Sequence, residues 1–195
     1  MATTLELPAE PKLPEQYELI DGEIVEVQPM GIYSSEVANC LHDELAVYAK
    51  RTRLGRSRMD MIFRLPLRRD ANRSRKPDVS FISFERWPED RPIPYRGNPL
   101  DVVPDLLVEV ISPMDEAEEV LKKAFEYLQA GARLVWLIYP GVQTIHAYTS
   151  PELPPRVFSP NSTLDAGDVL PGFSVPVAAL FPPVIGLPEG KSDEE

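Results

Sequence analysis

The sequence contains a single cysteine, Cys40, and only two histidines, His42 and His146. A disulfide framework needs at least two cysteines and a structural zinc site needs four cysteine or histidine ligands, so neither can be assembled within one chain. The same scarcity argues against a Cys–His or Ser–His nucleophile pair, with a role for His146 alone left open. We therefore expect any bound metal ion to rest on oxygen ligands.

Long apolar runs are missing as well. No stretch of the sequence approaches the roughly 20 consecutive apolar residues that a helix needs to cross a bilayer. The N-terminus is acidic and interrupted by prolines, so it lacks the apolar core of a signal peptide. We therefore expect a cytoplasmic protein that has no membrane partner.

The length and composition predict one folded domain. The 195 residues are 43% hydrophobic and 26% charged, which suffices for a sizeable core and differs from the composition of a disordered chain. Residues 1–16 contain three prolines and no periodicity, so we expect an irregular arm there. The domain is predicted over residues 17–181, and residues 182–195 are predicted to form a flexible tail.

Charge is distributed unevenly along the chain. The net charge is −11, which opposes binding to nucleic acid. Residues 50–76 nevertheless carry eleven basic and two acidic side chains, and the segments on either side are acidic. Such a basic stretch can contact the phosphate groups of DNA, and the candidate residues are Arg68, Arg69, Arg73 and Arg75. The alternative, to which charge alone gives equal weight, is that these arginines form a solvated loop and strand face.

The first half of the domain predicts a hairpin, a helix and two strands. Asp21 and Gly22 stand between two short β-prone runs, which is a strong hairpin signal. Apolar residues recur at steps of three and four over residues 34–50, so we expect an amphipathic helix there with Ser34 or Ser35 as its N-cap. Alternation predicts two further strands, in the segments MDMIFRLPL and KPDVSFIS.

The second half predicts the centre of the sheet. The segment LLVEVI is almost continuously apolar, which is typical of a strand buried on both faces. Residues 115–131 have a helical pattern with acidic residues in the first turn and Gly131 at the end, and ARLVWLIYP predicts a second buried strand. Strand, helix and strand in this order predict a right-handed crossover with two parallel strands. The remaining segments are predicted to close the edge of the sheet.

Glu109 lies in the middle of the LLVEVI segment, where an ionised carboxylate needs a compensating partner. One such partner is a divalent cation shared with a second carboxylate, and Asp78 at the start of its own strand is a candidate. Two carboxylates and a backbone carbonyl suit Mg²⁺ or Mn²⁺. The alternative is that Glu109 pairs with a buried arginine or lysine and that Asp78 is a turn residue.

Four segments together resemble the PD-(D/E)XK nuclease superfamily and, more closely, the restriction-endonuclease-like family often called Uma. They are YELIDGEIVEV, KPDVSFIS, PDLLVEVISP and KKAFEYLQAGARLVWLIYP, which occur in the order of that family and lie within residues 17–181. The resemblance implies an α/β, restriction-endonuclease-like fold in which helices flank a mixed central β-sheet. It also implies a Mg²⁺- or Mn²⁺-dependent endonuclease that hydrolyses phosphodiester bonds of DNA.

The resemblance also implies a set of site residues. Asp78 matches the motif aspartate and Glu109 the motif glutamate, so both correspond to metal ligands, and the main-chain carbonyl of Val110 corresponds to the third. Lys123 matches the lysine of the following helix. Glu18 matches the glutamate of the N-terminal hairpin, which in the family contacts the metal directly or through water.

The chain departs from the superfamily pattern at two positions. Ile111 stands where the superfamily has the lysine of its E-x-K motif, and the resemblance implies that Lys123 takes over this positive charge. The helix histidine of the family is missing, and the matching place is near Ser34. Lys122 is the adjacent alternative to Lys123, but it lies about 100° around the helix and is predicted to face solvent. For Tyr127, a packing role is favoured over a functional one.

Three hypotheses for function follow. The first is a metal-dependent DNA endonuclease, which we expect to be a homodimer because a two-fold dimer most simply cuts both strands of a duplex. The second is a relative that has lost turnover and binds nucleic acid or a protein, as Ile111 and the net charge of −11 suggest. The third is a structural homodimer whose acidic surface avoids DNA.

Overall fold

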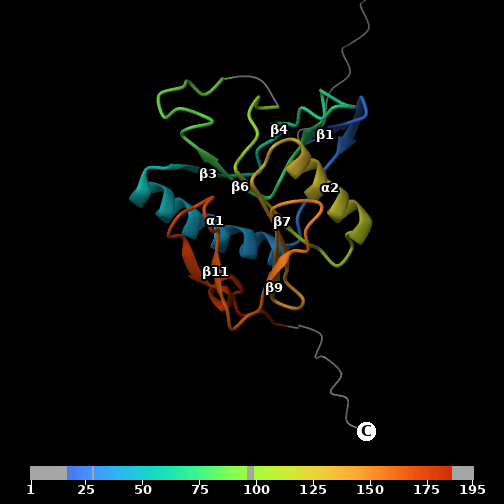
Figure 1. Ribbon diagram of the computed structural model, residues 1–195. Coiled ribbons are helices and arrows are strands. Elements are labelled where there is room, and N and C mark those ends of the chain that lie inside the picture. Colours follow the sequence, from blue (N-terminus) through green and yellow to red (C-terminus); the bar gives the residue numbers. More distant parts are fainter. Residues whose placement is uncertain (1–16, 28, 96–98, 186–195) are drawn as a thin grey trace, which may run out of the picture.

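The central sheet has six strands in the order β10-β9-β8-β7-β6-β3 (Figure 1). The computed structural model describes residues 17–27, 29–95 and 99–185. The strands of this sheet are β3 (Gly55–Met59), β6 (Val79–Ser83), β7 (Leu106–Val110), β8 (Leu134–Tyr139), β9 (Thr144–Tyr148) and β10 (Arg156–Phe158). β7 and β8 are parallel and the other neighbours are antiparallel, so the sheet is mixed and has the predicted parallel pair at its centre.

Two smaller sheets flank the central one. The first has the order β2-β1-β5-β4 and contains the predicted hairpin, with Asp21 and Gly22 at its turn. Its strands are β1 (Tyr17–Ile20), β2 (Glu23–Glu26), β4 (Phe63–Arg64) and β5 (Ser74–Arg75). The second pairs β11 (Thr163–Asp165) with β12 (Ser174–Pro176), ahead of the short 3₁₀ helix η1 (Val177–Leu180). In this last segment, Leu170, Phe173 and Leu180 are buried against the central sheet.

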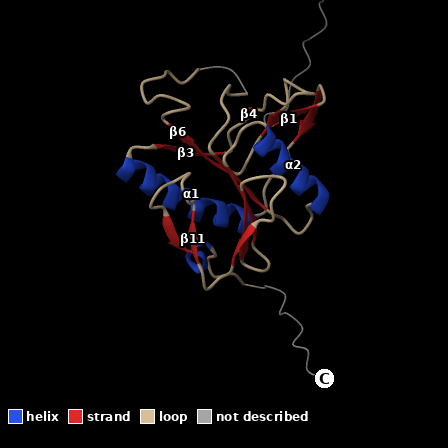
Figure 2. Ribbon diagram, in the orientation of Figure 1, coloured by secondary structure: helices blue, strands red, loops and turns tan. Residues whose placement is uncertain are grey.

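The two α-helices cover opposite faces of the central sheet (Figure 2). Helix α1 (Ile32–Thr52) packs Leu41 and Leu45 against the face that carries Val108 and Trp136. Helix α2 (Ala117–Gln129) packs against the face that carries Leu107, Val135 and Leu137. Because successive side chains of a strand point to opposite faces, β7 needs apolar residues at nearly every position. Glu109 is the exception, and it lies on the α2 face.

The first helix begins earlier than the sequence predicts. Its N-cap is Gly31, whose carbonyl accepts the N–H of Ser35 at 2.9 Å, so neither predicted serine caps it. Ser34 is buried inside the first turn. The second helix begins later than predicted, because Asp115 accepts the N–H of Ser112 at 2.7 Å and holds the preceding residues in a turn.

The prediction of one long strand over MDMIFRLPL is wrong. Strand β3 ends at Met59, and Asp60 takes a left-handed conformation with φ of 52°, which turns the chain away from the central sheet. Only Phe63–Arg64 forms a strand again, as β4 of the β2-β1-β5-β4 sheet. Turn residues such as aspartate tolerate positive φ better than most, so the break has a local cause.

The predicted arm at residues 1–16 lies outside the described residues, as does most of the predicted C-terminal tail. Among the helices of the described ranges, none is both long and apolar enough to cross a membrane.

Candidate active site

Asp78 and Glu109 lie opposite each other on neighbouring strands. The antiparallel register pairs Val79 with Val108, and one further step brings Asp78 opposite Glu109. The N–H of Asp78 donates to the carbonyl of Val108 at 3.1 Å, so the ladder continues to this point. Directly opposed residues have their Cβ atoms about 5 Å apart on one face of a sheet. The structure therefore brings together the two carboxylates that the sequence singles out.

Asp78 has an elevated pKa because of this arrangement. Burial and the neighbouring charge of Glu109 raise the pKa of Asp78 to about 7, against an ordinary value of 3.8. The N–H of Val110 donates to Asp78 Oδ2 at 2.6 Å and acts in the opposite direction. Two carboxylates that share a desolvated site repel each other, so a cation between them would favour their ionised forms.

Helix α2 supplies two partners to Glu109 from successive turns. Lys123 Nζ lies 3.1 Å from Glu109 Oε2, and the hydroxyl of Tyr127 donates to Glu109 Oε1 at 2.5 Å. Burial alone would lower the pKa of Lys123, but Glu109 and Glu18 raise it well above its usual value. The lysine is therefore a fixed positive charge. Lys122 instead faces solvent and pairs with Glu119, as the helical geometry predicts.

Glu109 therefore has the basic partner that the alternative interpretation required. Asp78 lies half-buried in a bend directly before β6, opposite Glu109. Tyr127 is fully buried, which agrees with the predicted packing role, and its hydroxyl also contacts the site. The sequence signal that reveals this contact is the spacing of four residues between Lys123 and Tyr127, which places both side chains on one face of the helix.

Glu18 reaches the site from strand β1. Its Oε2 accepts from Arg75 Nη1 at 2.7 Å, and its Oε1 accepts the N–H of Lys76 at 3.0 Å. The same oxygen lies 3.4 Å from Lys123 Nζ. Burial would raise the pKa of Glu18, but Lys123 and Arg75 bring it below its ordinary value. Both oxygens of Glu18 are thus engaged by protein donors, and the carboxylate also lies beside Lys123.

Arg73 and Arg75 correct the prediction that four arginines face DNA. Both side chains are buried. Arg75 forms ion pairs with Glu18 and Glu126, each at 2.7 Å, and Arg73 pairs with Glu126 at 3.3 Å. A buried guanidinium is stable only when carboxylates compensate it, and here β1 and α2 supply them. These two arginines hold the β2-β1-β5-β4 sheet against α2 and are almost fully buried.

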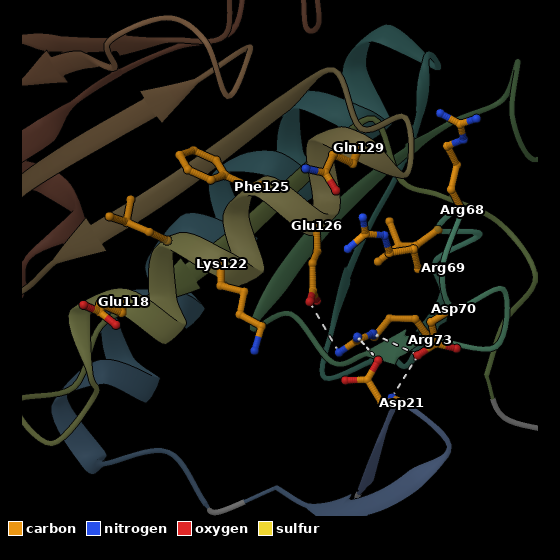
Figure 3. A pocket seen from close by; sticks show the side chains of 12 residues that line it. Asp21, Arg68, Arg69, Asp70, Arg73, Glu118, Lys122, Phe125, Glu126 and Gln129 are labelled. Carbon is orange, nitrogen blue, oxygen red and sulfur yellow. Dashed lines mark hydrogen bonds and ion pairs between the residues drawn. The ribbon is translucent and has the colours of Figure 1, made fainter.

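Arg68 and Arg69, by contrast, are exposed. They border a cavity of about 750 Å³ between the 67–70 loop and α2 (Figure 3). Figure 3 shows Arg73 linked to Asp21, Asp70 and Glu126, while Arg68 extends away from that group. DNA contact by Arg68 and Arg69 stays a prediction.

Sequence reasoning missed three charged residues around the site. Glu126 bridges Arg73 and Arg75, and its spacing of three residues from Lys123 was the available signal. Lys76 forms an ion pair with Asp60 and lowers the pKa of Asp78. No local pattern reveals the Lys76–Asp60 pair, because it depends on the left-handed turn at Asp60.

Comparison with known proteins identifies the family. A family model named Uma2, described as "Putative restriction endonuclease", matches residues 2–178. This chain belongs to the Uma2 family. Among solved structures, the Uma2 chain is similar to one described as a "putative nuclease belonging to DUF820" from Anabaena variabilis, with 24% sequence identity and a TM-score of 0.67. The match covers 87% of this chain and 93% of that one. No curated protein matches the sequence.

These findings confirm the resemblance and the α/β nuclease-like fold that the sequence predicts. The family description and the fold together support a nuclease. The residue roles at Asp78, Glu109, Lys123 and Glu18 do not follow from the comparisons, so they rest on the geometry of the site.

The donor set of this Uma2 chain fits a small divalent cation. Within the described ranges, no group of three or more Asp, Glu, His or Cys side chains is arranged to hold a metal. Mg²⁺, however, retains several waters and is commonly bound through only one or two carboxylates. Asp78 and Glu109, with the carbonyl of Val110 as the predicted third ligand, offer oxygens only. A small cavity of about 200 Å³ is bordered by Glu109 and Lys123.

Proposed function

We propose that this Uma2 protein is an endonuclease that hydrolyses phosphodiester bonds of DNA with Mg²⁺ or Mn²⁺ as its cofactor. The observation that carries the proposal is the opposed pair Asp78 and Glu109, with Lys123 Nζ 3.1 Å from Glu109. Two carboxylates and one fixed cation in a partly enclosed site are the groups that phosphodiester hydrolysis requires. The family match supports the same conclusion.

Each residue has a definite task in this proposal. Asp78 and Glu109 would hold the cation, which when bound neutralises charge on the phosphate and lowers the pKa of water. Lys123 donates hydrogen bonds to a phosphate oxygen or to the attacking water, and so orients it. The Tyr127 hydroxyl and Glu18 are positioning groups, because they act through Glu109 and Lys123 respectively.

A cleavage assay with matched variants tests the proposal. Wild type is incubated with mixed duplex and single-stranded DNA in Mg²⁺, Mn²⁺ or EDTA, beside Asp78→Asn and the control Asp165→Asn. Asp165 is a carboxylate on β11 that pairs with Arg156, away from the site. We expect cutting that requires metal, survives in the control and falls by at least roughly 100-fold in Asp78→Asn. Full activity in a double Asp78→Asn, Glu109→Gln variant would overturn the assignment.

Ile111 motivates the alternative of a relative that binds nucleic acid or a protein without turnover. The superfamily's usual lysine is replaced at this position, and Lys123 brings a positive charge to Glu109 from α2 instead. Thermal unfolding separates the two cases, because a ligand that binds only the folded state raises the melting temperature. We expect Mn²⁺ to raise the melting temperature of wild type and not of Glu109→Ala. No shift in wild type would favour the alternative.

A further inference from the structure

Strand β3 forms one edge of the central sheet (Figure 1). It carries Arg56 and Arg58 on the same face as the active site. Arg58 pairs with Ser80 and Arg56 pairs with Ile82, so these side chains share a face. Asp78 lies two residues before Ser80, on that same face. A step of two residues along a strand is about 7 Å. Residues that lie directly opposite one another across the strands form a row on this face. Arg58 therefore lies in the row next to that of Asp78 and Glu109, and Arg56 lies in the row after it.

Neither arginine has a carboxylate partner in the part of the chain that the structure describes. All ion pairs among the described residues are formed by side chains other than Arg56 and Arg58. Both side chains are nevertheless half-buried, and Nε of Arg56 is buried without a hydrogen-bond partner. The contrast with Arg73 and Arg75 is informative, because those arginines are compensated by acids of the protein itself.

The two guanidinium groups are held in place by neutral contacts. Arg56 Nη2 donates to the carbonyls of Pro88 and Glu89 at 3.2 and 3.3 Å, and its guanidinium lies over the ring of Phe84 at 5.0 Å. Arg58 Nη1 donates to the carbonyl of Ser57 at 2.7 Å. Burial and the charge of Arg56 lower the pKa of Arg58. Two adjacent, partly desolvated cations without a counter-charge form a site that favours an anion.

A cavity of about 610 Å³ opens at this edge on the side of α1, and Arg56 and Arg58 border it from β3. Its border includes four cationic side chains, Lys50, Arg53, Arg56 and Arg58, and one carboxylate, Glu89, which pairs with Arg53 at 3.3 Å. The region is thus locally positive in a protein whose net charge is −11. A ligand attracted here must be anionic and must extend along the strand to occupy both rows of arginine.

We propose that the β3 edge binds the phosphate backbone of the nucleic acid strand, with Arg58 and Arg56 contacting successive phosphates beside the one at Asp78 and Glu109. The inference rests on the proposed function and deepens it, because it names the surface that positions the substrate. It moves the principal backbone contacts away from Arg73 and Arg75, which are buried, to an edge strand that leads to the carboxylate pair.

Binding measured without cleavage tests this inference. Fluorescence anisotropy follows labelled single-stranded and duplex oligonucleotides in EDTA at several salt concentrations, for wild type, Arg56→Gln/Arg58→Gln and Arg133→Gln/Arg156→Gln. The last variant removes the same charge from two exposed arginines that have acidic partners on other strands or loops. We expect the β3 variant to bind about tenfold or more weakly and to lose about two from the slope of log K against log salt. The affinity of the Arg133→Gln/Arg156→Gln control for the oligonucleotides should stay within about twofold of that of wild type.

Two further variants keep the test decisive. Arg56→Lys/Arg58→Lys retains the charge and should restore most of the salt slope, which a general loss of folding would not allow. Arg58→Gln alone avoids the contacts of Arg56 with Phe84 if the double variant unfolds. Equal affinity and slope in the β3 variant and the control would overturn the inference and leave the nuclease proposal standing. The expected binding pattern without any metal-dependent cutting would support the inference and reject the nuclease proposal. No DNA binding by wild type in EDTA would overturn the inference, while metal-dependent cutting would still decide the nuclease proposal.

Discussion

Among the carboxylates of the site, Asp78 is the one whose ionised form is most destabilised by its surroundings. It faces Glu109 across two strands in a desolvated environment, and its pKa rises to about 7. The protein partly offsets this conflict with the N–H of Val110 and the nearby Lys123 and Lys76. Such an arrangement costs stability in the absence of a cation, which is common for residues retained for function.

This conflict predicts how stability depends on pH. Because the pKa of Asp78 is higher in the folded state than its ordinary value of 3.8, the folded state binds the proton more tightly. The resulting stabilisation is complete below about pH 4 and is lost as pH rises through about 7. In EDTA, we expect the free energy of unfolding of wild type to fall by about 3 kcal/mol over this range relative to Asp78→Asn. Urea titrations at several pH values measure it, and parallel curves for the two proteins would contradict it.

The Tyr127 hydroxyl offers a second test at the scale of one atom. Tyr127→Phe removes the donor to Glu109 Oε1 in a fully buried position and leaves the ring in place. We expect a loss of about 2 kcal/mol in the free energy of unfolding, because a hydrogen bond to a charged group is lost. Denaturant unfolding measures this loss, with Tyr95→Phe as the control. Tyr95 is fully exposed, so the same change there should have no measurable effect, and equal effects of the two substitutions would contradict the assigned contact.

Helix α2 and strands β1 and β5 form one electrostatic unit at the scale of elements. Glu126 of α2 pairs with both arginines around β5, and Glu18 of β1 pairs with Arg75 and lies close to Lys123. The strands of the β2-β1-β5-β4 sheet are short, so backbone pairing alone gives this sheet little stability. The buried ion pairs attach it to α2, and through Glu18 they also set the position of Lys123.

Glu126→Gln therefore separates a structural charge from a surface charge on the same helix. The substitution leaves two buried guanidinium groups with less compensation, and we expect the free energy of unfolding to fall by about 3 kcal/mol. The matched control is Glu119→Gln, which affects only an exposed pair with Lys122 and should change stability by less than about 0.5 kcal/mol. Chemical denaturation of both variants provides the measurement, and a loss below 1 kcal/mol for Glu126→Gln would show that the network contributes little.

At the scale of the whole molecule, the uneven distribution of charge along the chain corresponds to different locations in the fold. The basic segment at residues 50–76 divides between the interior and the surface, because Arg73 and Arg75 are buried while Arg56 and Arg58 line an edge of the sheet. A net charge of −11 opposes indiscriminate association with polyanions. We therefore expect contact with nucleic acid only at the few places where cations are concentrated.

The proposed activity on duplex DNA also makes a prediction about assembly. One set of carboxylates cuts one strand at a time, so a two-fold dimer is the simplest arrangement that cuts both strands at one site. We expect light scattering of the purified protein to give twice the mass of one chain. A monomer under conditions in which both strands of a duplex are cut at the same site would contradict this expectation.

Much of the fold was predictable because its signals are local. The Asp21-Gly22 hairpin, the buried LLVEVI strand and the parallel pair around α2 follow from turn chemistry and hydrophobic periodicity, and the structure confirms them. The same local signals failed at MDMIFRLPL, where one residue of positive φ ends the alternation. They also placed the ends of both helices a few residues from their observed positions, because the capping interactions involve the flanking turns.

The sequence by itself determined the central strand, the crossover and the candidate carboxylates, since an acidic residue in an apolar strand is visible without coordinates. Only the tertiary structure decided what surrounds them. Four arginines with the same local signal separated into two that are buried against Glu18 or Glu126 and two that are exposed. The physical reason is that compensation of a buried charge depends on residues far away in the chain, which only folding brings within the few ångströms over which ion pairs act.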